Sequence, residues 1–124
     1  MPFARISLHR GKSAAYLQAL SQGVHDALVE SFEVPGADRF QVIHQHDVGE
    51  LIFNPEYLGG PRSHDFVLIA ITAGRSRSVE TKQHFYRTLV EKLNEATGLS
   101  EEDVMVVITT TGSEDWSFAG GRGN

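Results

Sequence analysis

The sequence predicts an α/β (α+β) protein with one four-stranded mixed sheet and two helices on one face. Two observations carry this prediction: a β-α-β pattern occurs twice, and each copy joins a strand-like segment to a long amphipathic segment. Right-handed β-α-β units place their helices on the same face of a shared sheet. A chain of 124 residues has room for one hydrophobic core, so we expect one domain over 1–124.

The first copy of the pattern spans residues 2–47. Alternating apolar residues over 3–8 predict a half-buried strand, and Ser13 is a candidate helix N-cap. Apolar residues then recur at three- and four-residue steps: Leu17, Leu20, Val24, Leu28 and Phe32. Pro35 ends the predicted helix, and 39–46 has the composition of a second strand.

The second copy spans residues 65–111. The apolar run in 65–72 is typical of an interior strand, and Ser78 is a candidate N-cap for the helix that follows. The apolar stripe of this helix is formed by Phe85, Leu89 and Leu93. Gly98 stands where a helix-ending glycine is expected, and 104–108 predicts the fourth strand.

Local landmarks relate the two copies. Gly-Lys-Ser at 11–13 corresponds to Gly-Arg-Ser at 74–76, and Asp38 corresponds to Asp103. The register slips by two residues between these landmarks, which we attribute to a difference in helix length. An internal duplication is the simplest explanation.

The remaining segments are a long connection and a tail. The connection between the copies is longer than a typical loop, and we expect a short edge strand within it at Leu51–Phe53. The tail, 112–124, is rich in glycine and should be ordered only by docking on another part of the protein. Helices on one face leave the other face of the sheet bare, so we expect association into a closed cyclic assembly to bury it.

Composition and charge exclude several classes of function. A net charge of −5 argues against a nucleic-acid partner, and no apolar run approaches the length that crosses a membrane. The start of the chain does not resemble a secretory signal, and cysteine is absent. We therefore expect a cytoplasmic protein whose chemistry, without a cofactor, comes from oxygen and nitrogen groups.

Pro2 is the first candidate for that chemistry. A small second residue normally permits removal of the initiator methionine, which would leave a rigid secondary amine at the head of a strand. The pKa of such an amine can be tuned by burial and neighbouring charges until it suits proton transfer. Met-Pro is also a common start, and with Met1 retained the proline nitrogen is an amide without basicity.

Arg75 and Arg77 are the second candidates, placed between a central strand and a helix N-terminus. Two arginines at this spacing can grip one anion, and a small carboxylic acid suits the guanidinium fork. A solvated loop is the alternative interpretation. Asp38, which opens a strand, is either a turn residue or a group that holds water or polarises a carbonyl near a catalytic amine.

The histidines suggest a metal hypothesis that we do not favour. His44 and His46 alternate on one predicted strand and would point the same way, which supplies half of a zinc site. No third ligand has suitable spacing, so we expect no metal.

Together, Met1-Pro2, the duplicated β-α-β unit, Asp38, the two arginines and Trp116-Ser117-Phe118 resemble the tautomerase superfamily. The similarity is greatest to its malonate semialdehyde decarboxylase branch. The segments that carry it are VPGADRFQVIHQHDVGELI at 34–52, TAGRSRSVETKQHFY at 72–86 and EDWSFAGG at 114–121. The resemblance implies the fold of macrophage migration inhibitory factor and a homotrimer.

The resemblance also implies roles for individual residues. Pro2 would be the catalytic amine and Asp38 its partner, while Arg75 and Arg77 would bind the substrate carboxylate and polarise its carbonyl. Trp116 and Phe118 would form the apolar wall of the pocket. The tail is shorter than in the decarboxylases, which bears on substrate choice.

Three functions follow from these expectations. The first is decarboxylation or hydration of a small oxo-carboxylic acid such as malonate semialdehyde. The second is keto–enol tautomerisation of 2-oxo acids such as phenylpyruvate, which needs only Pro2 and a carboxylate clamp. The third is a non-catalytic trimeric binding protein, which retention of Met1 would favour.

Overall fold

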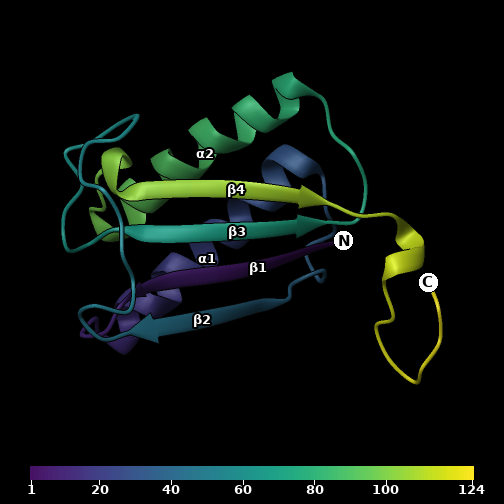
Figure 1. The fold of residues 1–124 in the computed structure, drawn as a ribbon. Coiled ribbons are helices and arrows are strands. Elements are labelled where there is room, and N and C mark those ends of the chain that lie inside the picture. The colour runs from purple at the N-terminus through teal and green to yellow at the C-terminus, as the bar shows by residue number, and fades with distance from the viewer.

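The computed structural model describes all residues, 1–124, as two helices packed on one four-stranded sheet (Figure 1). The elements are β1 (Pro2–His9), α1 (Ala14–Phe32), β2 (Gln41–His46), β3 (Val67–Ala73), α2 (Val79–Thr97) and β4 (Val104–Thr110), with 3₁₀ turns η1 (Glu101–Asp103) and η2 (Ser113–Asp115). Neither helix is long and apolar enough to cross a membrane.

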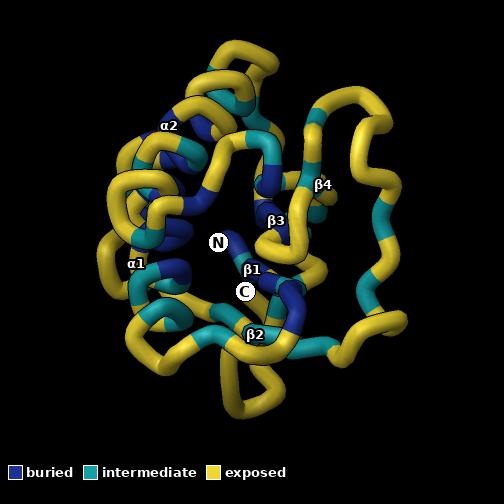
Figure 2. Tube along the Cα trace, turned by 90° about the vertical axis from the view of Figure 1, so that its left-hand side faces the viewer, coloured by how far each residue is buried: buried dark blue, intermediate teal, exposed yellow.

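The sheet has the strand order β2-β1-β3-β4. β1 pairs in parallel with β2, β3 pairs in parallel with β4, and the two halves meet where β1 and β3 run antiparallel. Each parallel pair is one β-α-β unit, and both helices cover the same face (Figure 2). The predicted fold class is confirmed.

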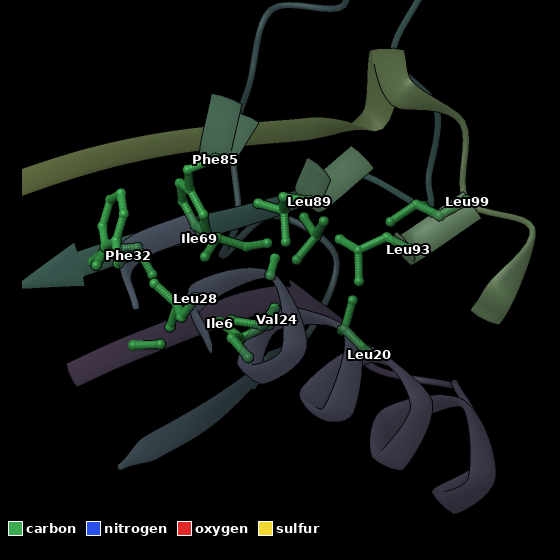
Figure 3. Packing of buried hydrophobic residues seen from close by; sticks show 14 of the residues in the cluster. Ile6, Leu20, Val24, Leu28, Phe32, Ile69, Phe85, Leu89, Leu93 and Leu99 are labelled. Atoms are coloured by element: carbon green, nitrogen blue, oxygen red, sulfur yellow. The ribbon is translucent and has the colours of Figure 1, made fainter. Parts of the chain in front are cut away.

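The core lies between the helices and the covered face of the sheet (Figure 3). Strand alternation sends one side of β1 and β3 into it, and helical periodicity adds one stripe of each helix. The strands contribute Ala4, Ile6, Leu8, Val67, Ile69 and Ile71, and the helices contribute Leu20, Val24, Leu28, Phe32, Phe85, Leu89 and Leu93. The predicted helix stripes are buried, except that Leu17 only packs at the rim.

No helix covers the opposite face of the sheet, and only the long connection before β3 runs along part of it (Figure 2). Val42, Met105 and Val107 remain 41%, 47% and 47% exposed there. Exposed apolar side chains that lie together on one face are typical of surfaces that contact a partner.

The two halves are equivalent position by position, with an offset of 65. Both helices have 19 residues, and their N-caps, Ser13 and Ser78, accept hydrogen bonds from Tyr16 and Thr81 N–H groups. The expected difference in helix length is therefore wrong. Gly11 and Gly74 are 63 residues apart instead of 65, so they are not equivalent positions, and this accounts for the two-residue slip. The loop between strand and helix tolerates such a difference, whereas the helices and their N-caps keep the offset of 65.

The expected edge strand at Leu51–Phe53 is also wrong. This segment pairs with no strand, and its contacts are with other groups. The Leu51 carbonyl lies 3.2 Å from Nε2 of His9, and the Phe53 ring stacks on the Phe66 ring with their centres 4.3 Å apart. β2 also begins at Gln41 rather than 39, since the Arg39 side chain turns back to Ser21 and Gln22 of α1.

Candidate active site

The N-terminus and Asp38 meet at one end of the sheet. The Met1 amine lies 3.2 Å from Oδ2 of Asp38, and both side chains are largely shielded from solvent. Asp38 reaches this position because a turn after α1 is closed by its N–H, which donates to the Pro35 carbonyl at 3.0 Å. The carboxylate thus faces the start of β1 and holds a cationic nitrogen there.

Pro2 is buried next to this ion pair and opens β1, where it is paired with Ala73 of β3. With Met1 present its nitrogen is an amide. The Met1 carbonyl accepts a hydrogen bond of 3.0 Å from the Gly74 N–H, which extends the β1–β3 ladder by one step. Pro2 is therefore held rigidly on a central strand, as positioned chemistry requires.

Arg77 is the partly buried member of the predicted arginine pair. It precedes the N-cap of α2, and its guanidinium lies 4.5 Å from the centre of the Phe32 ring. Nη1 donates to the Arg75 carbonyl at 3.0 Å, but Nε and Nη2 are buried and have no partner. Burial lowers the pKa of Arg77, the charge of Arg75 lowers it further, and Asp38 opposes both.

Two unpaired guanidinium donors in a dry setting are costly unless a ligand accepts from them. Their spacing suits a carboxylate. Arg75 is exposed and makes no side-chain hydrogen bond, so the structure does not bring the two arginines together as a closed clamp. Arg77 alone carries the buried donors.

An aromatic cluster stands at the same end. Trp116 and Phe118 stack with ring centres 5.6 Å apart, and Phe118 lies 5.6 Å from Phe40. The Trp116 indole donates to Oγ1 of Thr111 at 2.7 Å, and Thr111 in turn binds the Ala73 carbonyl. The predicted apolar wall is thus tied to the end of β3.

The tail extends beyond the end of the sheet at which the chain begins (Figure 1) and makes local contacts there. Asn124 donates its backbone N–H to the Trp116 carbonyl at 3.2 Å, and its side-chain amide lies 3.0 Å from Sδ of Met1. Sequence reasoning did not find Asn124, Phe40 or Thr111 as neighbours of Pro2. For Phe40 one signal was available: side chains alternate between the two faces of a strand, and by this alternation Phe40 points away from the core, as Val42 does.

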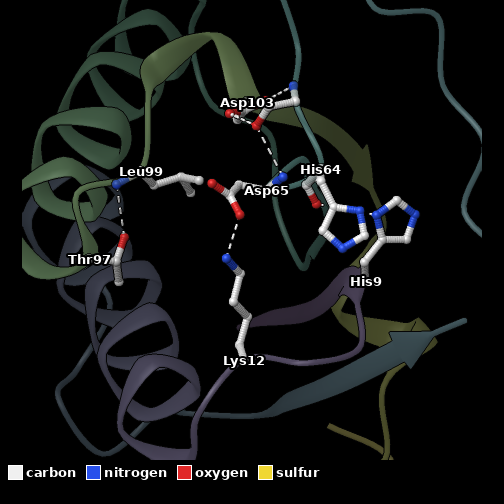
Figure 4. Close-up of polar contacts among 8 residues, drawn as sticks. His9, Lys12, His64, Asp65, Thr97, Leu99 and Asp103 are labelled. Atoms are coloured by element: carbon white, nitrogen blue, oxygen red, sulfur yellow. Dashed lines mark hydrogen bonds and ion pairs between the residues drawn. The ribbon is translucent and has the colours of Figure 1, made fainter. Parts of the chain in front are cut away.

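The opposite end of the sheet holds the counterpart of this site (Figure 4). By the offset of 65, Lys12 is equivalent to Arg77, and it binds the carboxylate of Asp65. Asp103, the equivalent of Asp38, is buried and accepts from the N–H and hydroxyl of Ser63 at 2.6 and 2.7 Å. Lys12, Asp65 and Asp103 therefore each have a partner within the chain.

His9 completes this end of the molecule. Its ring stacks on His64 at 4.5 Å, and its two nitrogens lie 3.2 Å from the carbonyls of His64 and Leu51. His44 and His46 face each other on β2 with ring centres 6.3 Å apart. No group of three or more His, Cys, Asp or Glu side chains is placed to hold a metal.

Two surface hollows lie away from Pro2. One of about 640 Å³ runs along α1 beside Arg39 and Ile43, and another of about 610 Å³ lies between the 51–58 loop and β4. Neither is lined by Pro2, Asp38 or Arg77.

This fold and this site define the class of protein: a small α/β chain whose second residue, a proline, is buried beside an aspartate and an unpaired arginine. Comparison with known families agrees. Two models described as tautomerase enzyme match residues 2–60 and 38–119, so the chain belongs to the tautomerase family.

Individual relatives resemble the chain over nearly its whole length. It is 37% identical to the probable tautomerase YusQ of Bacillus subtilis (strain 168), covering 98% of this chain and 96% of that protein, and 36% identical to the probable tautomerase YrdN of the same organism, covering 98% and 94%. A solved malonate semialdehyde decarboxylase is 36% identical, with a TM-score of 0.92, over 97% of this chain and 92% of that one.

Proposed function

We propose that the chain is an N-terminal-proline acid–base enzyme that acts on small oxo-carboxylic acids, with decarboxylation or hydration of a malonate semialdehyde-like substrate as its leading reaction. The observation that carries the proposal is the pair of buried, unpartnered Arg77 donors at the same end of the sheet as Pro2 and Asp38. Such an arrangement suits a carboxylate held next to an amine.

The other half of the chain supports the assignment of Arg77. Lys12 occupies the equivalent position before the N-cap of α1 and already binds a carboxylate, that of Asp65. A cation in this position of the fold therefore has the reach and orientation to hold a carboxylate. At the Arg77 end no side chain fills that role, which leaves it for a substrate.

The proposed mechanism requires removal of Met1, so that Pro2 carries a free secondary amine. Asp38, which holds the Met1 amine in the structure, would then hold the Pro2 ammonium. The Pro2 ammonium would donate to the substrate carbonyl oxygen while Arg77 and Arg75 hold the carboxylate out of conjugation. The bond to the carboxylate carbon breaks, its electron pair moves into the carbonyl as an enolate, and carbon dioxide leaves. Return of a proton to carbon gives the aldehyde.

Preorganised charge at the carbonyl oxygen is commonly the largest catalytic contribution, with one donor worth roughly 3–4 kcal/mol. Trp116 and Phe118 would exclude water and strengthen these interactions. The solved relative at 36% identity is described in terms of decarboxylase and hydratase activities, which supports the same substrate class here.

Keto–enol tautomerisation of 2-oxo acids such as phenylpyruvate is the second candidate, and the names of the Bacillus relatives favour it. It needs a neutral proline that takes a proton beside the carbonyl and returns it elsewhere. Asp38 favours the ammonium and the arginines favour the neutral amine. A non-catalytic binding protein would be the outcome if Met1 stays in place.

The first experiment is a proton NMR time course with malonate semialdehyde, using protein shown by intact mass to lack Met1. We expect acetaldehyde to appear with the wild type and not with Pro2→Ala. Equal rates for both would remove Pro2 from the mechanism. Acetaldehyde absent, with enol-phenylpyruvate ketonised in a Pro2-dependent way, would select the tautomerase instead.

We further propose that the chain forms a homotrimer through the bare face of the sheet. Its exposed apolar residues support association, and a structural neighbour of the same fold, 21% identical with a TM-score of 0.78, is described as a symmetric trimer.

A further inference from the structure

Gly74 lies at the centre of the contacts that Met1 makes. Its N–H donates to the Met1 carbonyl at 3.0 Å, and the residue is buried. A Cβ at position 74 would lie 2.9 Å from Cβ and Cε of Met1, and the three atoms closest to it all belong to Met1. The φ of Gly74 is not in the left-handed range, so the backbone conformation does not require glycine. The Met1 side chain leaves no room for a Cβ, and this is why glycine fits here.

Removal of Met1, on which the proposed function depends, would change the surroundings of Gly74 directly. Its N–H would lose its acceptor, and the space beside its Cα would open. A buried backbone donor without an acceptor costs about 1–3 kcal/mol, so it offers a ligand oxygen a strong gain.

The position of this donor relative to Pro2 is set by covalent geometry. The Met1 carbonyl carbon is bonded to the Pro2 nitrogen, which places the Met1 oxygen about 2.2 Å from that nitrogen. A substrate oxygen needs to sit only about 0.5 Å farther out to accept from both the Gly74 N–H and the Pro2 ammonium at ordinary hydrogen-bond lengths.

We infer that the Gly74 N–H is a further substrate-binding group of this site. It donates to the same carbonyl oxygen that the Pro2 ammonium contacts, and the substrate chain lies over Gly74 where the Met1 side chain packs. This inference rests on the proposed function and narrows the substrate class: a short, unbranched oxo acid fits, because the space that Met1 occupies beside Gly74 is one side chain wide.

The two donors would share the charge that develops on that oxygen as the carbon–carbon bond breaks. A fixed backbone N–H does not need to reorganise during the reaction, which is the property that makes such donors effective. Gly74 therefore complements Arg77: one holds the carbonyl oxygen and the other holds the carboxylate.

The test uses ¹⁵N-labelled, Met1-free protein titrated with malonate, an unreactive dicarboxylate of the same length as malonate semialdehyde. We expect the Gly74 amide proton to move downfield and to exchange more slowly as malonate binds. Gly74→Ala keeps the N–H but places a methyl in the space beside it, and we expect KM for malonate semialdehyde to rise at least tenfold. Gly36→Ala is the matched control, since a Cβ there meets nothing within 4 Å; its kcat/KM should stay within twofold of wild type.

The outcomes separate the two proposals. If turnover depends on Pro2 but the Gly74 amide does not respond to malonate and Gly74→Ala keeps wild-type kcat/KM, the Gly74 inference is wrong and the proposed function stands. If Met1-free protein shows neither Pro2-dependent turnover of any oxo acid nor malonate binding, both are wrong. Circular dichroism of Gly74→Ala, expected to match wild type, shows that the KM effect does not come from misfolding.

Discussion

At the scale of single residues, Arg77 combines burial with unsatisfied hydrogen-bonding capacity. Its Nε and Nη2 have no partner, while its plane rests on Phe32. Lowering of its pKa by burial means that the folded protein disfavours the charge, yet a guanidinium stays protonated across the physiological range. The folded state carries that cost at every ordinary pH, and a bound carboxylate would relieve it.

We therefore expect Arg77→Met to separate activity from stability. Loss of charge-assisted hydrogen bonds to the substrate should lower kcat/KM at least 100-fold, which corresponds to about 3 kcal/mol. The free energy of unfolding should stay within about 1 kcal/mol of wild type, because an unpaired buried cation leaves with the side chain. Steady-state kinetics and urea unfolding measure the two effects. Arg75→Met is the exposed control and should cost less activity; destabilisation of Arg77→Met by more than 2 kcal/mol would assign the residue to the fold instead.

At the scale of elements, equivalent positions of the two β-α-β units have different partners. We interpret the units as an internal duplication. Asp38 pairs with the chain's own amine at the N-terminal end, whereas Asp103 is enclosed by two bonds from Ser63. The equivalent aspartates thus face different groups: an amine at one end of the sheet and Ser63 at the other.

These two aspartates form a natural pair for mutagenesis. Asp103→Ala removes a buried carboxylate that accepts two hydrogen bonds from Ser63. We therefore expect the unfolding free energy to fall by about 2–3 kcal/mol with modest loss of activity. Asp38→Ala should cost at most about 1 kcal/mol of stability and lower kcat at least 100-fold. Chemical denaturation and kinetics on both variants test this contrast, and the reverse pattern would exchange the two roles.

The Lys12–Asp65 ion pair belongs to the same scale, since it joins the turn before α1 to the segment before β3. The hydrogen bond and charge of Asp65 raise the pKa of Lys12. A raised pKa of a basic group stabilises the folded state below the group's ordinary pKa, and this contribution disappears as pH rises through the folded value.

Asp65→Asn should therefore lower the unfolding free energy at pH 8 by no more than about 1 kcal/mol, since the pair is partly exposed. The difference from wild type should shrink as the pH passes 10.5, the ordinary value for lysine. Urea denaturation from pH 8 to 11.5 is the measurement. A difference that grows with pH would contradict the assigned cause.

At the scale of the whole molecule, the bare sheet face is the feature that a monomer leaves unexplained. Apolar residues of β2 and β4 stay exposed on this face, whereas both helices pack on the other face. A closed trimer would bury them without leaving an open edge.

Light scattering coupled to gel filtration should give three times the chain mass of 13.7 kDa. Val107→Asp places a charge on the part of the bare face that β4 forms and should yield monomer, because a carboxylate buried there without a partner is costly. Tyr86→Asp, on the outer side of α2, is the matched control and should remain trimeric. A wild type that elutes as a monomer at micromolar concentration would refute the trimer.

Much of this structure could be predicted from local patterns in the sequence. Periodicity located the four strands and both helices, Ser13 and Ser78 marked the helix starts, and Gly98 marked a helix end, because these signals depend on residues close together in the chain. Pro2, Asp38 and the arginines could be selected because their side-chain chemistry is limited to a few roles.

Contacts between distant segments decided the rest. The folded chain buries Arg77 and leaves Arg75 in solvent, brings Phe40, Thr111 and Asn124 to the N-terminal end, and packs Phe53 on Phe66 instead of forming an edge strand. Burial and partner choice depend on what the other half of the molecule places nearby, and no local pattern encodes that. The contact between Gly74 and Met1 also depends on tertiary structure, since residues 73 positions apart meet only when β1 and β3 pair.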